Sequence, residues 1–375
     1  MSTQPSPPCS PEPISNIMET AETFASSMKK TSQFWFFDGN IVLLTWPNIV
    51  FRVHKGVLAL HSEFFRNMFQ DSSEVPPHVP HSPNDRSSWR IEGCPIICLP
   101  DGTSDIWELL RVVYGQRREL KYPVDVSFET VAALIRVGDK YGVHRLVAEC
   151  KPHLVHMVPR TLDDYARASS HRFSLLYCPH YAIEAVNVFR LLDMFGPQAP
   201  HITSFLLFLC TQLDEKKICT GTIRSIMDLT VDRLSDEDKE RVLALKRELK
   251  RRGEQAVAAL QEPSAECRQR GDLSMCTLVY ERLILYMSES YIMELCEHGG
   301  LFRRDIVQDI YALMDSAPWL CVRCVQSKAG ALVALQEETW RLLPVLAGVL
   351  KEGEVEVDEW ERWDEEADEE KRRIW

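Results

Sequence analysis

The chain lacks the apolar segments that membrane insertion and secretion require. Its longest strongly apolar run, residues 202–210, is shorter than the ~20 residues that span a bilayer. The N-terminal stretch is rich in Pro and Ser and contains no apolar core of the kind found in secretory signals. We therefore expect an intracellular, soluble protein with no membrane partner, in which the twelve cysteines are reduced.

The sequence also lacks the local motifs by which most enzymes are recognised. It contains no Gly-rich phosphate loop, no Gly-x-Ser-x-Gly elbow and no His-Glu-x-x-His helix. With twelve cysteines and eleven histidines, Cys/His pairs arise by chance, and most such thiols pack as small apolar groups. We assign no catalytic residue and expect a protein that is not an enzyme and needs no cofactor.

Negative charge is concentrated at one end of the chain. The formal net charge is −12, and residues 351–375 alone have twelve acidic and five basic residues. The rest of the chain is therefore close to neutral, and an acidic tail is predicted at 351–375. An acidic protein does not attract phosphate over long range, so direct binding to nucleic acid is not expected.

Length and composition predict a two-part globular protein. At ~100–200 residues per domain, 375 residues correspond to about two domains. Apolar residues make up 45% of the chain, enough for a sizeable core. Residues 1–33 begin with five prolines among serines and are interpreted as a disordered arm, with ordered structure starting at Phe34.

The segment 34–158 has the pattern of a small α+β domain. Strand-forming runs at 40–45 and 49–53 flank a Trp-Pro-Asn turn and predict a β-hairpin. A helical period follows from His54, with Ser62 as the expected N-cap of a second short helix. Four prolines predict a long loop at 71–93. The remaining predicted elements are a strand at 96–99 and helices at 104–114, 128–141 and 144–158.

Beyond residue 159 the strand signals stop and helical patterns continue to residue 350. The fold class predicted for the whole chain is thus α+β, with a small β-sheet flanked by helices followed by an all-helical region. The predicted helices of this region are 162–169, 182–195, 202–213, 223–229, 236–260, 278–297, 304–314 and 332–350.

Two motifs, in this order of elements, resemble the BTB/POZ domain. One is Phe51-x-x-His54-Lys55-x-x-Leu58, and the other is Asp139-Lys140-Tyr141 in the closing helical pair. The resemblance covers residues 34–158. The whole chain is also similar to the fungal, basidiomycete-type BTB proteins, which have a comparable Asp-Gly-Asn opening and a helical C-terminal extension.

The resemblance implies a protein-interaction module. Such domains commonly form homodimers, and many bind a cullin or a transcriptional corepressor. The expected dimer interface includes exposed aromatic residues of 34–37, among them Phe34 and Phe36, and the first helices after His54. The family's charged pocket implies a pairing of Asp38 with Lys55, although ungapped alignment places the family's aspartate nearer Asn40. His54 itself is expected to bridge backbone groups where a strand turns into a helix.

Two functions remain open at this point. One is a homodimeric scaffold or transcription-associated protein, and the other is a substrate adaptor for a cullin-type ubiquitin ligase. Cullin-binding members tend to have an apolar residue two places before a glutamate in the loop after the second helix, whereas here Ser72 precedes Glu74. The sequence therefore favours the scaffold, with itself and unidentified proteins as partners.

One cysteine pair has the spacing of a metal site. Cys321 and Cys324 form a Cys-x-x-Cys, and with Cys267 and Cys276 upstream they make four candidate zinc ligands. The surrounding apolar residues favour buried thiols instead, so no bound metal is expected.

Overall fold

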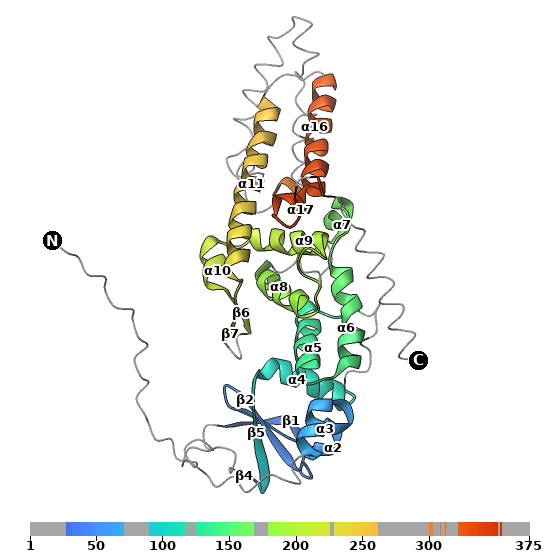
Figure 1. Ribbon diagram of the computed structural model, residues 1–375, viewed down its shortest axis with the longest axis vertical. Coiled ribbons are helices and arrows are strands. Elements are labelled where there is room, and N and C mark those ends of the chain that lie inside the picture. Colours follow the sequence, from blue (N-terminus) through green and yellow to red (C-terminus); the bar gives the residue numbers. More distant parts are fainter. Residues whose placement is uncertain are drawn as a thin grey trace, which may run out of the picture.

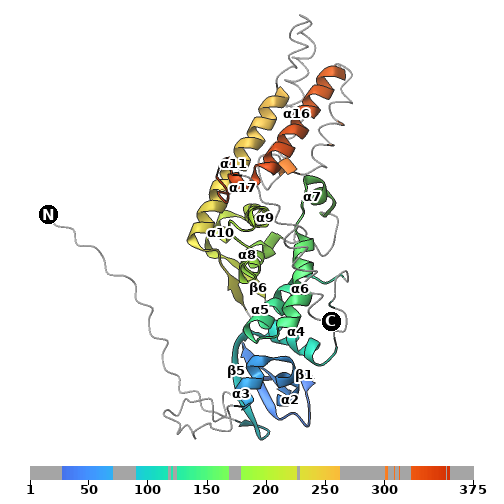
Figure 2. The same ribbon diagram turned by 45° about the vertical axis from the view of Figure 1, so that its right-hand side comes forward.

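The computed structural model of the chain is elongated, with a β-sheet at one end and a pair of long helices at the other (Figures 1 and 2). The description covers residues 28–70, 90–116, 120, 125–168, 179–225, 229–261, 300–302, 308, 312, 322–351, 353 and 354.

A mixed five-stranded sheet forms the base of the molecule. The strands lie in the order β1-β3-β2-β5-β4, with β2 and β3 antiparallel as the predicted hairpin and β5 parallel to β2. Ile and Val are frequent in the hairpin, and β-branched side chains suit a pleated strand. The strands are β1 (Lys29–Trp35), β2 (Ile41–Trp46), β3 (Ile49–Val53), β4 (Arg90–Ile91) and β5 (Cys94–Gly102).

Both faces of this sheet are buried. Because successive side chains on a strand point to opposite faces, Leu43 and Phe51 pack toward the helices, whereas Val42 and Val50 belong to a smaller cluster on the other face. All four side chains are fully buried. Because both faces are buried, the strands have near-continuous apolar runs and do not alternate apolar with polar residues.

Five helices complete the N-terminal part and follow the predicted pattern closely. Ser62 caps α3 as expected, because its Oγ accepts a hydrogen bond of 3.1 Å from the backbone N–H of Phe65. A left-handed glycine, Gly142, makes the turn between α5 and α6. The helices are α2 (Lys55–His61), α3 (Glu63–Gln70), α4 (Thr103–Val113), α5 (Phe128–Lys140) and α6 (His144–Met157).

The C-terminal part is helical and is built around α9, in which all twelve residues are buried. Helices α8, α11 and α17 pack against α9, and α11 and α16 run side by side away from the sheet (Figures 1 and 2). Its elements are α7 (Leu162–Ala168), η4 (Pro179–Tyr181), α8 (Ala182–Leu191), α9 (Pro200–Thr211), α10 (Glu215–Thr220), β6 (Thr222–Ser225), β7 (Thr230–Asp232), α11 (Asp236–Gln261), η5 (Gly300–Phe302), α16 (Val322–Arg341) and α17 (Leu343–Leu346).

One apolar cluster runs through both parts. It extends without a break from Phe34 in the sheet to Trp340 in α16, and α5 of the N-terminal part packs directly on α8. The helical region is thus attached through a shared core.

The prediction of a helix at 223–229 is wrong. The chain forms the antiparallel hairpin β6–β7 there, with Ile223 paired to Val231. The β-branched residues of both strands favour extended backbone, and Gly221 at φ +96° turns the chain sharply at the end of α10. The apolar spacing in this segment is shared by a short helix and a short strand, so periodicity alone could not separate them.

Other predicted boundaries also differ from the structure. Strand β1 begins at Lys29, inside the expected arm 1–33, because parallel pairing with β3 holds residues 29 and 30. Strand β4 occupies the end of the expected loop 71–93. Helix α16 begins at Val322 rather than at 332. The helices predicted at 278–297 and 304–314 and the sequence beyond residue 354 fall outside the described segments, apart from single positions.

Among the helices of the described part of the chain, none combines the length and apolar character needed to cross a membrane.

The Gly221→Ala substitution is expected to destabilise the protein. A Cβ at this position would lie 2.3 Å from the carbonyl oxygen of Asp232, and the positive φ alone costs about 1–3 kcal/mol for a non-glycine residue. Urea denaturation measures the loss. The matched control is Gly330→Ala, at an open position in α16, which should raise stability by up to about 1 kcal/mol. Equal effects of the two substitutions would contradict the argument.

Candidate protein-interaction site

His54 lies between β3 and α2 and contacts two side chains from other segments. Its Nδ1 is 2.9 Å from the hydroxyl of Tyr114, and its Nε2 is 3.2 Å from Oδ1 of Asp38. The backbone N–H of His54 also donates to the Tyr114 hydroxyl at 3.0 Å. The imidazole therefore joins the β1–β2 turn to the end of α4. The imidazole thus contacts two side chains and not the backbone groups that the sequence predicted.

Aromatic rings surround this histidine. Phe36 stacks on Tyr114 with ring centroids 4.7 Å apart and lies 5.1 Å from the His54 ring. Burial raises the pKa of Tyr114, and the nearby Asp38 carboxylate raises it further, although the hydrogen bond from His54 acts in the opposite direction. Tyr114 therefore stays a neutral phenol that holds His54 in place.

Asp38 and Lys55 do not form the charged pair that the family resemblance implies. The Asp38 carboxylate contacts His54, whereas the Lys55 Nζ lies 5.7 Å from the ring centroid of Phe69. The position near the family's aspartate is occupied by Asn40, whose Oδ1 accepts a hydrogen bond of 2.8 Å from the backbone N–H of Lys55. The amide of Asn40 thus keeps a hydrogen bond to the backbone of Lys55, but it has no negative charge to pair with the Lys55 ammonium.

The expectation that Phe34 is an exposed interface residue is wrong. Its side chain is fully buried and packs edge-to-face against Trp107, with ring centroids 5.2 Å apart. The residue faces α4 because it lies on the inner side of β1. Phe37, three residues later in the β1–β2 turn, is the exposed aromatic of this segment at 89% exposure.

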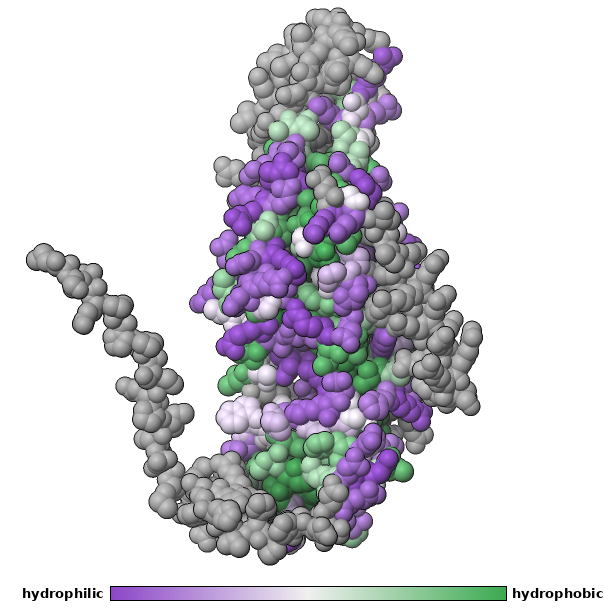
Figure 3. Space-filling model, viewed as in Figure 1, coloured by the Kyte–Doolittle hydropathy of each residue, from purple (hydrophilic) through white to green (hydrophobic). Residues whose placement is uncertain are grey.

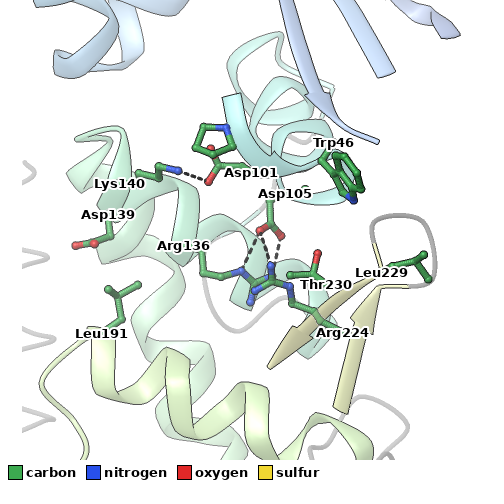
Figure 4. Close-up of a pocket in the computed structure, with 12 residues that line it drawn as sticks. Trp46, Asp101, Asp105, Arg136, Asp139, Lys140, Leu191, Arg224, Leu229 and Thr230 are labelled. Atoms are coloured by element: carbon green, nitrogen blue, oxygen red, sulfur yellow. Dashed lines mark hydrogen bonds and ion pairs between the residues drawn. The ribbon is translucent and has the colours of Figure 1, made fainter. Parts of the chain in front are cut away.

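A second candidate surface lies where the N-terminal domain meets the helical region (Figure 4). Arg136 of α5 is its centre: the guanidinium donates to both carboxylate oxygens of Asp105 in α4, at 2.7 and 3.1 Å, and to Oε1 of Glu184 in α8 at 2.5 Å. Arg224 of β6 lies within 3.8 Å of Asp105 and within 3.7 Å of Asp232 in β7. We call these five residues the junction cluster.

Burial controls the charges of the junction cluster. Burial raises the pKa of Glu184 to about 7, and the charge of Asp232 adds to this, while the Arg136 and Arg224 guanidiniums oppose it. For Arg136, burial acts to lower the pKa, but the hydrogen bonds and charges of Asp105 and Glu184 outweigh it and raise the pKa above its ordinary value. Arg136 is therefore always cationic.

Three members of the junction cluster, Asp105, Arg136 and Arg224, form part of the wall of a pocket of about 620 Å³. Figure 4 shows Arg136 and Arg224 converging on Asp105 on one side of it, with Trp46 and Leu229 on the side of the sheet and hairpin and Leu191 across from them. These three apolar side chains are all exposed, from 41% to 66%. Apolar rims around a few oriented polar groups are typical of binding sites.

No local sequence signal marks the junction cluster, because Arg136 pairs with residues that lie 31 and 48 positions away along the chain. One usable signal exists. Arg136 and Glu184 each lie within an apolar stretch of their helix, residues 131–137 and 182–186, and a buried charge requires a partner.

Of the four candidate zinc ligands, Cys267, Cys276 and Cys321 fall outside the described residues, and Cys324 is buried in α16. Within the described ranges, no three His, Cys, Asp or Glu side chains are grouped so as to hold a metal ion.

Comparison with known proteins agrees with the N-terminal architecture. Residues 35–157 match the family model of the BTB/POZ domain, so this part of the chain is a BTB/POZ domain. No curated protein and no solved structure matched the chain. BTB/POZ domains are a protein-interaction fold, and the chain thus contains a protein–protein interaction module followed by a helical region.

The Arg136→Met substitution should be strongly destabilising. It leaves the buried carboxylates of Asp105 and Glu184 without their shared partner, at a cost of about 3–5 kcal/mol. Arg145→Met is the control, because Arg145 pairs with Glu149 at the surface, where such pairs contribute at most about 0.5 kcal/mol. Chemical denaturation at pH 7 measures both. A loss for Arg136→Met no larger than for the control would contradict a structural role of the cluster.

Proposed function

We propose that the protein is a non-enzymatic, homodimeric scaffold in which the BTB/POZ domain joins two copies and each helical region presents a surface to a further protein. The observation that carries the proposal is the BTB/POZ domain at residues 35–157, since this fold acts through binding other proteins. The absence of local catalytic motifs from the sequence agrees with this assignment.

Exposed apolar side chains in the BTB/POZ domain support self-association. Phe37 in the β1–β2 turn, Leu60 in α2 and Phe64 in α3 are exposed by 89%, 72% and 42%. Each such side chain contributes about 1.5–3 kcal/mol when an interface buries it fully. Phe36 remains part of this proposed surface together with His54, Asp38 and Lys55, whereas Phe34 belongs to the core of its own chain.

The helical region is suited to present a partner surface because it shares a core with the BTB/POZ domain. On the face shown in Figure 3, apolar residues gather over the sheet end, while α11 and α16 display mostly hydrophilic residues. The exposed apolar residues at the junction pocket, Trp46, Leu191 and Leu229, offer a second place for a protein to bind.

Size-exclusion chromatography with light scattering on the full chain at micromolar concentration should give twice the chain mass of 43.2 kDa. The double variant Phe37→Ser/Leu60→Ser removes two exposed apolar anchors and should shift the equilibrium toward monomer at least tenfold, which corresponds to about 1.4 kcal/mol. Leu229→Ser, at an exposed apolar residue outside the domain, should leave the mass unchanged.

A wild-type chain that runs as a clean monomer would overturn the homodimer. A dimer that both variants leave intact would place its interface elsewhere and overturn the assignment of Phe37 and Leu60. Affinity capture of the intact protein tests the scaffold itself: a stoichiometric cullin in the captured material would show the adaptor function instead.

A further inference from the structure

The junction cluster holds more negative than positive charge. Its carboxylates are Asp105, Glu184 and Asp232, and its guanidiniums are Arg136 and Arg224. When all five are ionised, the cluster has a net charge of −1. Since arginine does not lose its proton in proteins, the cluster reaches neutrality only when one carboxyl group binds a proton.

The contacts indicate which carboxyl group takes the proton. Both oxygens of Asp105 accept hydrogen bonds from Arg136, and Oδ1 of Asp232 accepts one of 3.1 Å from Asn187. Glu184 and Asp232 each have one engaged oxygen and one buried oxygen, Oε2 and Oδ2, that has no hydrogen-bond partner. With 3% side-chain exposure against 11% for Asp232, Glu184 is the more buried of the two, so its charged form is the more costly.

Of the charged groups on the described elements around α8, Lys140 of α5 pairs with Asp101. Helix α9 contains no Asp, Glu, Lys or Arg, and its His201 contacts the carbonyl oxygen of Pro159. In α8 itself, Arg190 pairs with Asp238 of α11. In η4, the ring of His180 contacts that of Tyr181, with ring centroids 4.0 Å apart.

The cluster ties together elements from both parts of the molecule. Asp105 and Arg136 belong to the BTB/POZ domain, whereas Glu184, Arg224 and Asp232 belong to the helical region. Two ion pairs cross the junction, Arg136–Glu184 and Arg224–Asp105, and Figure 4 shows the second of them. A change in the charge of Glu184 therefore changes how firmly the two parts hold each other.

We propose that the junction cluster is a proton-dependent clamp, closed when Glu184 is protonated and loosened as Glu184 ionises. The direction of the pH effect follows from the linkage between proton binding and stability. A carboxyl group with a folded-state pKa of about 7, above its ordinary 4.5, stabilises the closed junction fully below pH 4.5 and loses this contribution as the pH rises through 7. The clamp would set the orientation of the helical region independently of dimerisation.

Hydrogen exchange of the full chain at pH 6 and pH 8, corrected for intrinsic exchange rates, tests the clamp. Opening the junction restores an ordinary pKa to Glu184, so protection of α8 and of β6–β7 should fall about tenfold between these two pH values. Protection of β2 and β3, which belong to the interior of the sheet, serves as the internal reference and should not change with pH.

Two cluster variants and one control make the test specific. Glu184→Gln keeps an oxygen for Arg136 and has no proton to lose, so its protection should be equal at both pH values. Asp232→Asn makes the cluster neutral with Glu184 ionised, and the pH-dependent loss should shrink below about threefold. Glu149→Gln, in an ion pair with Arg145 on α6, should keep the full tenfold loss.

A junction whose protection is equal at pH 6 and pH 8 in the wild type would overturn the clamp. So would a loss that persists unchanged in Glu184→Gln or, should that variant fold poorly, in Asp232→Asn.

Discussion

The guanidinium of Arg136 projects from α5 of the BTB/POZ domain toward α8 of the helical region and binds carboxylates from both sides. The bidentate contact with Asp105 fixes the orientation of the planar guanidinium. In this orientation the remaining Nη1 donor points at Glu184. The packing of α5 on α8, the position of the β6–β7 hairpin and the shape of the junction pocket all depend on this arrangement.

A shared apolar core and a polar clamp act differently at the same junction. The core, which runs from Phe34 to Trp340, supplies most of the attachment energy because it removes a large apolar area from water. Apolar contacts tolerate small shifts between helices, whereas a hydrogen-bonded ion pair does not. The ionic groups thus select one orientation of the helical region, and the core stabilises it.

Sequence patterns predicted the BTB/POZ domain because short stretches of sequence determine most of its strands, helix ends and turns. The apolar runs of β2 and β3, the Ser62 cap and the glycine between α5 and α6 each determine a short segment. The junction cluster could not be predicted in this way, since its contacts depend on the packing of α4, α5, α8 and the hairpin. Phe34 was misassigned for a related reason: the sequence identifies an aromatic run, but only the pairing of β1 with β3 decides which ring faces inward.

An ionic junction is a costly way to join two parts, because a well-packed apolar substitute is often equally stable or more stable. The excess carboxylate adds to that cost, because Glu184 and Asp232 each keep a buried oxygen that has no hydrogen-bond partner. An apolar junction would have the same strength at every pH. A junction with one carboxylate too many is strong only when a proton is bound, so the charge imbalance that lowers stability is also what makes the attachment responsive to pH.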